Sequence, residues 1–157
     1  MAQQSIEYGR RQGHGHCVFP FPVGASEVFK KKGGAFVIQD GSGRVEIAAG
    51  AEVGIIGHAL FNEDFTASAT EGANKVPVDM SWDSVWELPI NSGTWADTMR
   101  GKVCDLSVSS SIQGVALAAS TNDEVILVDK GTTNPAGTVV SVLVMRNPNT
   151  QVLSGVV

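Results

Sequence analysis

Short apolar segments alternate with turn-forming residues along most of this 157-residue chain, and this pattern sets the strongest limit on its fold. The two clearest segments, 124–128 and 138–145, are rich in valine and are separated by a stretch containing Gly-Thr-Thr-Asn-Pro-Ala-Gly. β-Branched residues favour strands, whereas Gly, Asn and Pro favour the turns between them. Strands at such short spacing predict an all-β fold, either a small barrel or a sandwich.

The same signals predict further strands and at most one short helix. Polar and apolar residues alternate in 102–108, as is typical of a half-buried strand. Asp40-Gly41 lies between two other apolar segments and favours a hairpin turn. Residues 94–100 begin with a Thr and are followed by a Gly, which favours a short helix, and the polar residues 62–75 predict an exposed loop. The expected strands are 35–38, 44–47, 53–60, 76–78, 85–90, 102–108, 114–118, 124–128 and 138–145.

The first part of the chain shows no strand or helix period. In Phe19-Pro20-Phe21-Pro22, each proline fixes its own φ and holds the residue before it in an extended conformation. Two aromatic rings on a stiff segment are typical of a docking element rather than of a core strand. We therefore expect an extended N-terminal arm over 1–32 and a β-rich body over 33–157. The body is either one unit or two β sub-units, 33–84 and 85–157.

Charge is distributed unevenly between these two parts. The arm carries five basic and two acidic side chains, and the body carries six basic and fourteen acidic ones, for net charges of +3 and −8. Charged residues make up only 17% of the chain, against about 25% in typical proteins. An acidic body repels phosphate, so the basic arm predicts a protein partner and no nucleic acid.

The cysteines and the hydropathy pattern bear on the cellular compartment. Cys17 and Cys104 lie far apart and neither belongs to a Cys-x-x-Cys motif, so we expect two free thiols in a reducing compartment. The first residues contain no apolar segment of the kind found in secretory leaders. No apolar run approaches the roughly 20 residues of a membrane-spanning helix, so no membrane partner is expected.

A metal site is the main chemical alternative. His14 and His16 form a His-x-His pair, which places both rings on one face of a strand. His58 and Asn62 are spaced as in the second motif of the cupins, a family of metal-binding β-barrels, and that similarity implies an enzyme using His14, His16 and His58. The first cupin motif lacks its carboxylate here, because Pro20 stands at that position. We therefore expect no metal and no other cofactor.

Other catalytic motifs are missing from the sequence. It contains no Gly-x-Ser-x-Gly nucleophile motif, and Ser109-Ser110-Ser111 is typical of a polar turn. Gly41-Ser42-Gly43 lacks the Lys-Ser/Thr of a phosphate-binding loop. These observations predict a protein that is not an enzyme.

Three tryptophans, Trp82, Trp86 and Trp95, lie close together in the sequence. Tryptophan anchors both cores and subunit interfaces, so all three are candidates for an oligomer interface, with core packing as the alternative. Two segments, 55–60 and 112–117, share the pattern Ile-x-Gly-x-Ala-Leu. A Gly within a strand favours close approach of another backbone, and we expect this at both positions.

The order of motifs after residue 85 resembles that of a known family. Glu87-Leu88-Pro89 is followed by Gly101-Lys102-Val103, by Ile112-x-Gly114-Val115-Ala116 and by Val125-Ile126-Leu127-Val128. Over roughly residues 85–145 this pattern is similar to that of the small β-rich proteins that decorate the capsids of tailed bacteriophages. In that family a Glu-Leu-Pro-like strand precedes a Gly-Asp-Val-like strand, and Lys102 stands here in place of the Asp.

The resemblance implies a structural role. It predicts a homotrimeric decoration or cement protein, made in the host cytoplasm, that binds the major capsid protein on the outer surface of the virion and stabilises capsomer contacts. Another component of the phage, such as a fibre base or tail part, is the remaining alternative. The residues expected to contact the capsid are those of the arm: Tyr8, Arg10, Arg11, His14, His16, Phe19, Phe21, Lys30, Lys31 and Lys32.

Overall fold

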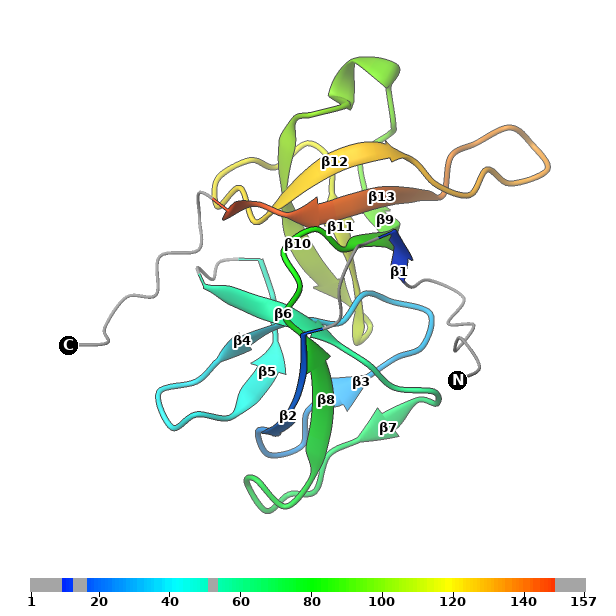
Figure 1. The fold of residues 1–157 in the computed structure, drawn as a ribbon. Helices are drawn as coiled ribbons and strands as arrows, with labels where there is room; N and C mark the ends of the chain where they lie inside the picture. Colours follow the sequence, from blue (N-terminus) through cyan, green and yellow to red (C-terminus); the bar gives the residue numbers. More distant parts are fainter. Residues whose placement is uncertain (1–9, 13–16, 51–53, 149–157) are drawn as a thin grey trace.

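The computed structural model describes residues 10–12, 17–50 and 54–148, and the protein is all-β, as the sequence predicts (Figure 1). Within these residues the expected helix at 94–100 is only a 3₁₀ turn, η1 (Asp97–Met99), and no helix is long and apolar enough to span a membrane. The strands are β1 (Arg10–Gln12), β2 (Val18–Pro22), β3 (Val28–Phe29), β4 (Phe36–Gln39), β5 (Val45–Ile47), β6 (Ile55–Ala59), β7 (Phe65–Thr66), β8 (Lys75–Asp79), β9 (Val85–Ser92), β10 (Val103–Ser109), β11 (Ile112–Ala116), β12 (Val125–Lys130) and β13 (Ser141–Arg146).

Strands β9 to β13 close into a five-stranded barrel, which we call the C-terminal barrel. β9 pairs antiparallel with β13 on one side and parallel with β11 on the other. The ring is completed by antiparallel pairs of β11 with β10, β10 with β12, and β12 with β13. β1 pairs with the first residues of β9, outside this ring.

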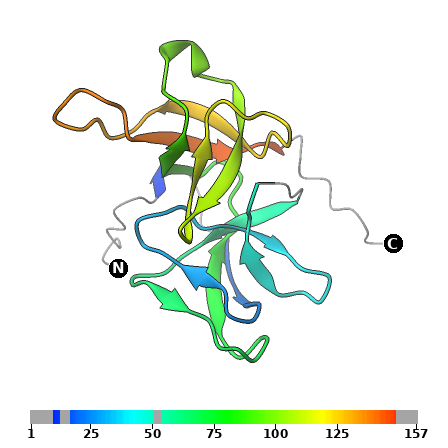
Figure 2. The same ribbon diagram turned by 180° about the vertical axis from the view of Figure 1, so that it is seen from behind.

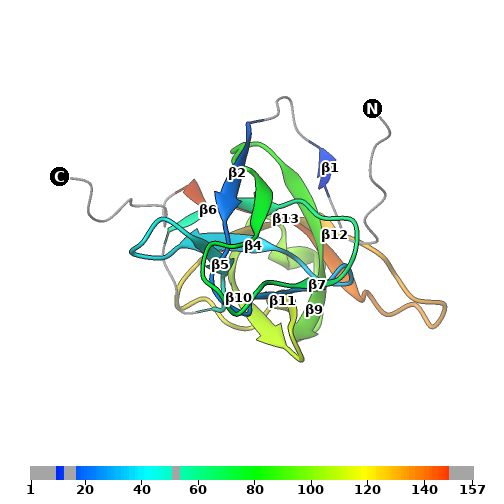
Figure 3. The same ribbon diagram turned by 90° about the horizontal axis from the view of Figure 1, so that it is seen from below.

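The other large sheet has the strand order β2-β8-β6-β4-β5 and forms the N-terminal barrel. A parallel bridge between Val23 and Val45 joins its two open ends, so the sheet curls round on itself. β3 and β7 form a separate two-stranded ribbon beside it. The ring of Phe29 stacks on that of Phe65 with centroids 4.7 Å apart and lies edge-on to Phe61, so the ribbon packs on the core of this barrel. Figures 2 and 3 show the two barrels from behind and from below.

The described part of the predicted arm is built into the N-terminal barrel. β2 contains the Phe-Pro-Phe-Pro segment and pairs antiparallel with β8, while Val23 and Phe29 are buried. Part of the predicted arm, from β2 to Phe29, is thus paired or packed with the body in this structure. Pro20 lies opposite Pro77. Because proline has no N–H to donate, this pair fits only a position of the ladder without mutual hydrogen bonds.

Both glycines of the Ile-x-Gly-x-Ala-Leu pattern allow the close backbone approach that the sequence predicts. A Cβ on Gly57 would lie 2.4 Å from the carbonyl oxygen of Asp79, and one on Gly114 would lie 2.5 Å from that of Pro89. Real Cβ atoms do not approach an oxygen this closely. Gly57 lies beside β8 and Gly114 beside β9, so the same motif serves the same purpose in each barrel.

Candidate interaction surfaces

Of two buried apolar clusters, one contains residues of both barrels, and we call it the shared core. It includes Trp86, whose ring is one of a stacked pair. His58 of β6 and Trp86 of β9 are parallel within 5°, with ring centroids 3.7 Å apart. Trp86 is only 2% exposed. The Trp86 side chain is buried in the core that joins the barrels. The hypothesis that Trp86 lies at an oligomer interface is therefore wrong, because a single chain already buries this side chain.

Both ring nitrogens of His58 are engaged by backbone groups. Nε2 lies 3.0 Å from the amide nitrogen of Ala35 and accepts its hydrogen bond, so Nδ1 carries the proton and donates to the carbonyl oxygen of Ala59 at 2.8 Å. Burial lowers the pKa of His58 to about 3, against opposing effects of the Ala59 hydrogen bond and the charge of Asp79. His58 is therefore a neutral structural residue with no nitrogen left for a metal.

The structure gives no further support to the cupin-like alternative. Within residues 10–12, 17–50 and 54–148, no group of three or more His, Cys, Asp and Glu side chains is arranged to hold a metal ion. His14 and His16 lie outside the described residues. The cupin-like spacing of His58 and Asn62 is thus a coincidence of sequence, because His58 points into the core.

Gln113 of β11 fastens the C-terminal barrel to β4 of the other barrel. Its Oε1 accepts a hydrogen bond from the amide of Phe36 at 2.8 Å. Its Nε2 donates to the carbonyl oxygens of Phe36 at 2.9 Å and Ala48 at 2.8 Å. Across the inter-barrel interface, the side-chain amide thus makes the hydrogen bonds that a neighbouring strand's backbone would make. Sequence reasoning missed Gln113, and the only signal was a polar residue inside an otherwise apolar strand.

Arg146, the last residue of β13, makes a second polar connection between the barrels. Its Nη1 donates to the carbonyl oxygens of Ile56 at 2.6 Å and Ile55 at 3.2 Å, and its Nη2 donates to that of Met80. The guanidinium lies 4.1 Å from the centroid of the Trp82 ring. Burial lowers the pKa of Arg146 from its usual value, against the opposing charge of Asp79. A buried charge held by carbonyls and an aromatic face fixes both barrels in one orientation.

The exposed apolar side chains are few. Among described residues, Phe19 and Trp82 are each 54% exposed, and Val18 and Val108 are exposed to a lesser degree. Trp82 lies in the turn before β9, so it shares no strand with Trp86. Phe21 is half-buried and packs against the core of the N-terminal barrel, so it presents less surface to a partner than Phe19 does. Phe19 and Trp82 remain as candidate contact residues.

The described basic residues of the predicted arm are partly neutralised within the chain. Lys30 Nζ lies 3.3 Å from Asp64 Oδ2, and the amide of Lys31 donates to Asp64 Oδ1 at 2.6 Å. Lys32 is exposed. Arg10 and Arg11 belong to β1, while Tyr8, His14 and His16 lie outside the described residues. The structure therefore brings Lys30 and Lys31 together with Asp64, and the charge of Lys32 also acts on this carboxylate.

A shallow hollow lies at one end of the C-terminal barrel. Its lining is mainly apolar and includes Met99, Val103, Leu117, Ala118, Ser120 and Leu127. Trp95 is half-buried and packs against the shared core, and its Nε1 donates to Asp97 Oδ1 at 3.2 Å. Trp95 is thus both a core residue and a neighbour of η1, which borders this hollow.

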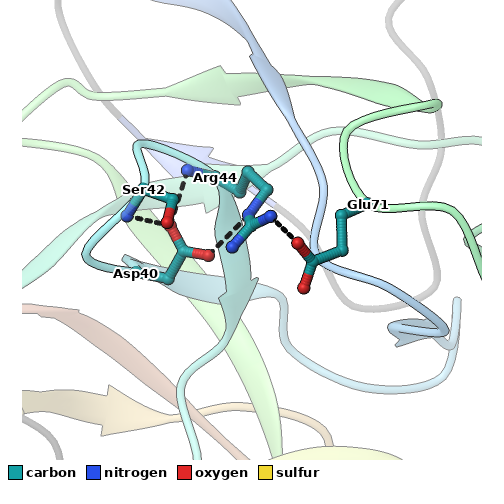
Figure 4. A network of polar contacts seen from close by, with 4 residues as sticks. All are labelled: Asp40, Ser42, Arg44 and Glu71. Carbon is teal, nitrogen blue, oxygen red and sulfur yellow. Dashed lines mark hydrogen bonds and ion pairs between the residues drawn. The ribbon is translucent and has the colours of Figure 1, made fainter.

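A charged turn joins β4 and β5 at the far end of the other barrel (Figure 4). Asp40 Oδ1 accepts hydrogen bonds from the amides of Ser42 and Arg44, both at 2.8 Å, and Asp40 Oδ2 lies 2.7 Å from Arg44 Nε. Arg44 also pairs with Glu71 of the loop before β8. Despite the opposing effect of desolvation, these hydrogen bonds lower the pKa of Asp40. The Asp-Gly turn predicted from the sequence is confirmed, and its charges hold it to a neighbouring loop.

His58, Gln113 and Arg146 are buried between the barrels, whereas Phe19 and Trp82 are exposed. Comparison of the chain with protein families, curated proteins and solved structures finds no match.

Proposed function

We propose that this protein is a structural component of a tailed bacteriophage, which binds the outside of the assembled head as an oligomer and stabilises contacts between capsomers. One observation carries the proposal. The resemblance to capsid decoration proteins covers roughly residues 85–145, and the C-terminal barrel runs from Val85 to Arg146. The motifs that carry the resemblance thus belong to one closed structural unit rather than to scattered strands.

The inter-barrel interface supports the same role. Gln113 and Arg146 hold the two barrels in a fixed orientation, so surfaces on different barrels keep a constant separation. A rigid body loses little conformational entropy when it binds two neighbouring capsomers at once. A protein that binds only the assembled shell stabilises that shell by mass action.

Phe19 is the described residue best suited to contact the shell. It is exposed at the edge strand β2, next to the segment that precedes it in the predicted arm. An exposed aromatic side chain on a rigid strand is a typical anchor of protein interfaces. Lys32 is exposed as well and adds positive charge on this barrel.

The test is co-sedimentation with empty heads, assembled from the major capsid protein encoded in the same genome. We expect the wild-type protein to bind saturably, and Phe19→Ser to bind at least tenfold more weakly. Val108→Ser is the matched control, because Val108 is also an exposed apolar strand residue but lies on the other barrel. Wild-type protein that stays in the supernatant would overturn the decoration function, and Phe19→Ser protein that binds like wild type would overturn the role of Phe19.

The alternative of a tail or fibre-base component predicts a different place on the particle. Gold-labelled antibody against the protein should decorate heads if the proposal is correct. Label confined to tails or baseplates would replace it with the alternative.

A further inference from the structure

The hairpin between β12 and β13, residues 131–140, extends from the C-terminal barrel, and we call it the projecting hairpin. Figures 1 and 3 show it extending well away from the C-terminal barrel. The segment contains Gly131, Thr132, Thr133, Asn134, Pro135, Ala136, Gly137, Thr138, Val139 and Val140. An exposed hairpin buries few apolar side chains, so its backbone conformation depends mainly on hydrogen bonds.

The backbone of the projecting hairpin is extensively paired with itself. Thr133 and Val139 form an antiparallel bridge, and the amide of Asn134 donates to the carbonyl of Thr138 at 2.8 Å. Asn134 Oδ1 accepts from the amides of Ala136 at 3.0 Å and Thr138 at 2.9 Å. Gly137 has a φ of +82°, which favours glycine at the tip. The hairpin is therefore preorganised before it meets a partner.

A buried carboxylate holds the base of the hairpin. Glu87 Oε1 accepts from the hydroxyl of Thr132 at 2.6 Å, the amide of Thr132 at 3.0 Å and the hydroxyl of Ser141 at 2.6 Å. Glu87 is 4% exposed. Burying a carboxylate is costly unless hydrogen bonds compensate, and these three hydrogen bonds tie Glu87 to the base of the hairpin.

Charge separates this hairpin from the rest of the surface. Residues 131–145 include no charged side chain, although residues 33–157 carry a net charge of −8. Two copies of such an acidic body repel each other unless they meet through uncharged surface. The charged Asp40–Arg44 turn would not meet this condition, whereas the projecting hairpin does.

The hollow of the C-terminal barrel also offers a surface that would not repel an acidic second copy. No acidic side chain lines it in the described part of the chain, and its one charged lining residue is Lys102. We propose that the projecting hairpin of one copy occupies this hollow on a second copy. The contact joins two different patches of one barrel, so it is heterologous, and it forms a ring where the rotation between successive copies closes. The inference rests on the proposed function only in treating the protein as an oligomer, and it leaves the N-terminal barrel free.

The test begins with the molar mass of the full chain by light scattering coupled to size exclusion. Wild type should be an oligomer, and Ala136→Asp in the hairpin and Ala118→Asp in the hollow should each reduce the mass to that of one 16.4 kDa chain. Gly41→Asp places the same charge on the other exposed turn and should leave the oligomer intact. Unchanged circular dichroism and melting temperature show that the variants fold.

Cross-linking identifies the two patches directly. In a Cys17→Ser background, Ala136→Cys protein mixed with Ala118→Cys protein should give cross-linked dimers with a short bismaleimide. Ala136→Cys protein alone should give at least tenfold less. Equal yields, or an oligomer that survives both aspartate substitutions, would overturn the inference.

The outcomes also separate this inference from the proposed function. A wild-type protein that stays monomeric but still sediments with heads overturns the hairpin contact and leaves decoration intact. An oligomer that depends on the hairpin and the hollow but does not bind heads would overturn the decoration function and leave the hairpin contact intact.

Discussion

The imidazole of His58 lies face to face with the indole of Trp86, 3.7 Å away between ring centroids, and this contact joins the two barrels. The stack depends on a neutral imidazole, because a proton on Nε2 would point at the amide of Ala35, which already donates to that atom. The buried stack on Trp86 and the neutral, Nδ1-protonated form of His58 therefore depend on each other. Several expectations follow from it and from the features around it.

Protonation of His58 should make stability depend on pH. Its pKa is about 3 in the folded protein and about 6.5 in the unfolded chain, so below pH 6.5 the unfolded state binds a proton that the folded state refuses. Stability is therefore lost as pH falls from 6.5 toward 3. Between pH 7.5 and pH 5, wild type should lose about 2 kcal/mol more unfolding free energy than His58→Gln, measured by urea denaturation. A constant difference between the two proteins across this range would contradict the expectation.

The two neighbouring tryptophans should differ in their contribution to stability. Trp86→Ala removes a fully buried ring from the shared core, and we expect a loss of about 3–5 kcal/mol in urea denaturation followed by circular dichroism. Trp82→Ala removes an exposed ring that covers Arg146, and we expect a loss of about 1 kcal/mol. Similar losses in the two variants would mean that the inter-barrel interface does not depend on the His58–Trp86 stack.

Two glycines should resist substitution by alanine, and a third should accept it. The Cβ of Gly57→Ala or Gly114→Ala would overlap a backbone oxygen, so each variant should lose about 1–3 kcal/mol or fail to fold. A Cβ on Gly41 would meet nothing within 4 Å, so Gly41→Ala should change stability by less than about 0.5 kcal/mol. Thermal melts of the three variants provide the comparison, and a neutral Gly57→Ala would show that β6 and β8 move apart easily.

The two thiols should react at very different rates. Cys17 is exposed, whereas Cys104 is buried, and burial together with Asp105, Glu124 and Asp123 raises the pKa of the Cys104 thiol to about 12. At pH 8 only about one Cys104 in ten thousand is a thiolate, the reactive form. A chromogenic disulfide reagent should therefore label one thiol per native chain and a second only after denaturation. Rapid labelling of native Cys17→Ser protein would contradict this.

Much of the fold was accessible from the sequence because period-two alternation and turn chemistry act locally. The segment 102–108 corresponds to Val103–Ser109, and 35–38 corresponds to Phe36–Gln39. The alternation in these segments reports burial on one face, which any barrel requires. The free state expected for both cysteines is also confirmed.

What the sequence did not reveal depends on contacts between distant residues. Prolines in Val18–Pro22 favoured a free arm, and only the pairing with β8 shows that they suit an edge strand. β7 lies in a polar segment whose Phe65 finds its partners across the chain. The partners of Gln113 and Arg146 have no local signal, because the carbonyl oxygens that these side chains bind come from the other barrel.

The pairing of Pro20 with Pro77 has a consequence for aggregation. At a position without mutual hydrogen bonds, the N–H and C=O groups of an edge strand point outward, and Pro20 and then Pro22 present no N–H there. A second chain that tried to extend the sheet at β2 would find two consecutive outward positions without donors. Crowded copies of the protein would therefore not aggregate by adding strands along this edge.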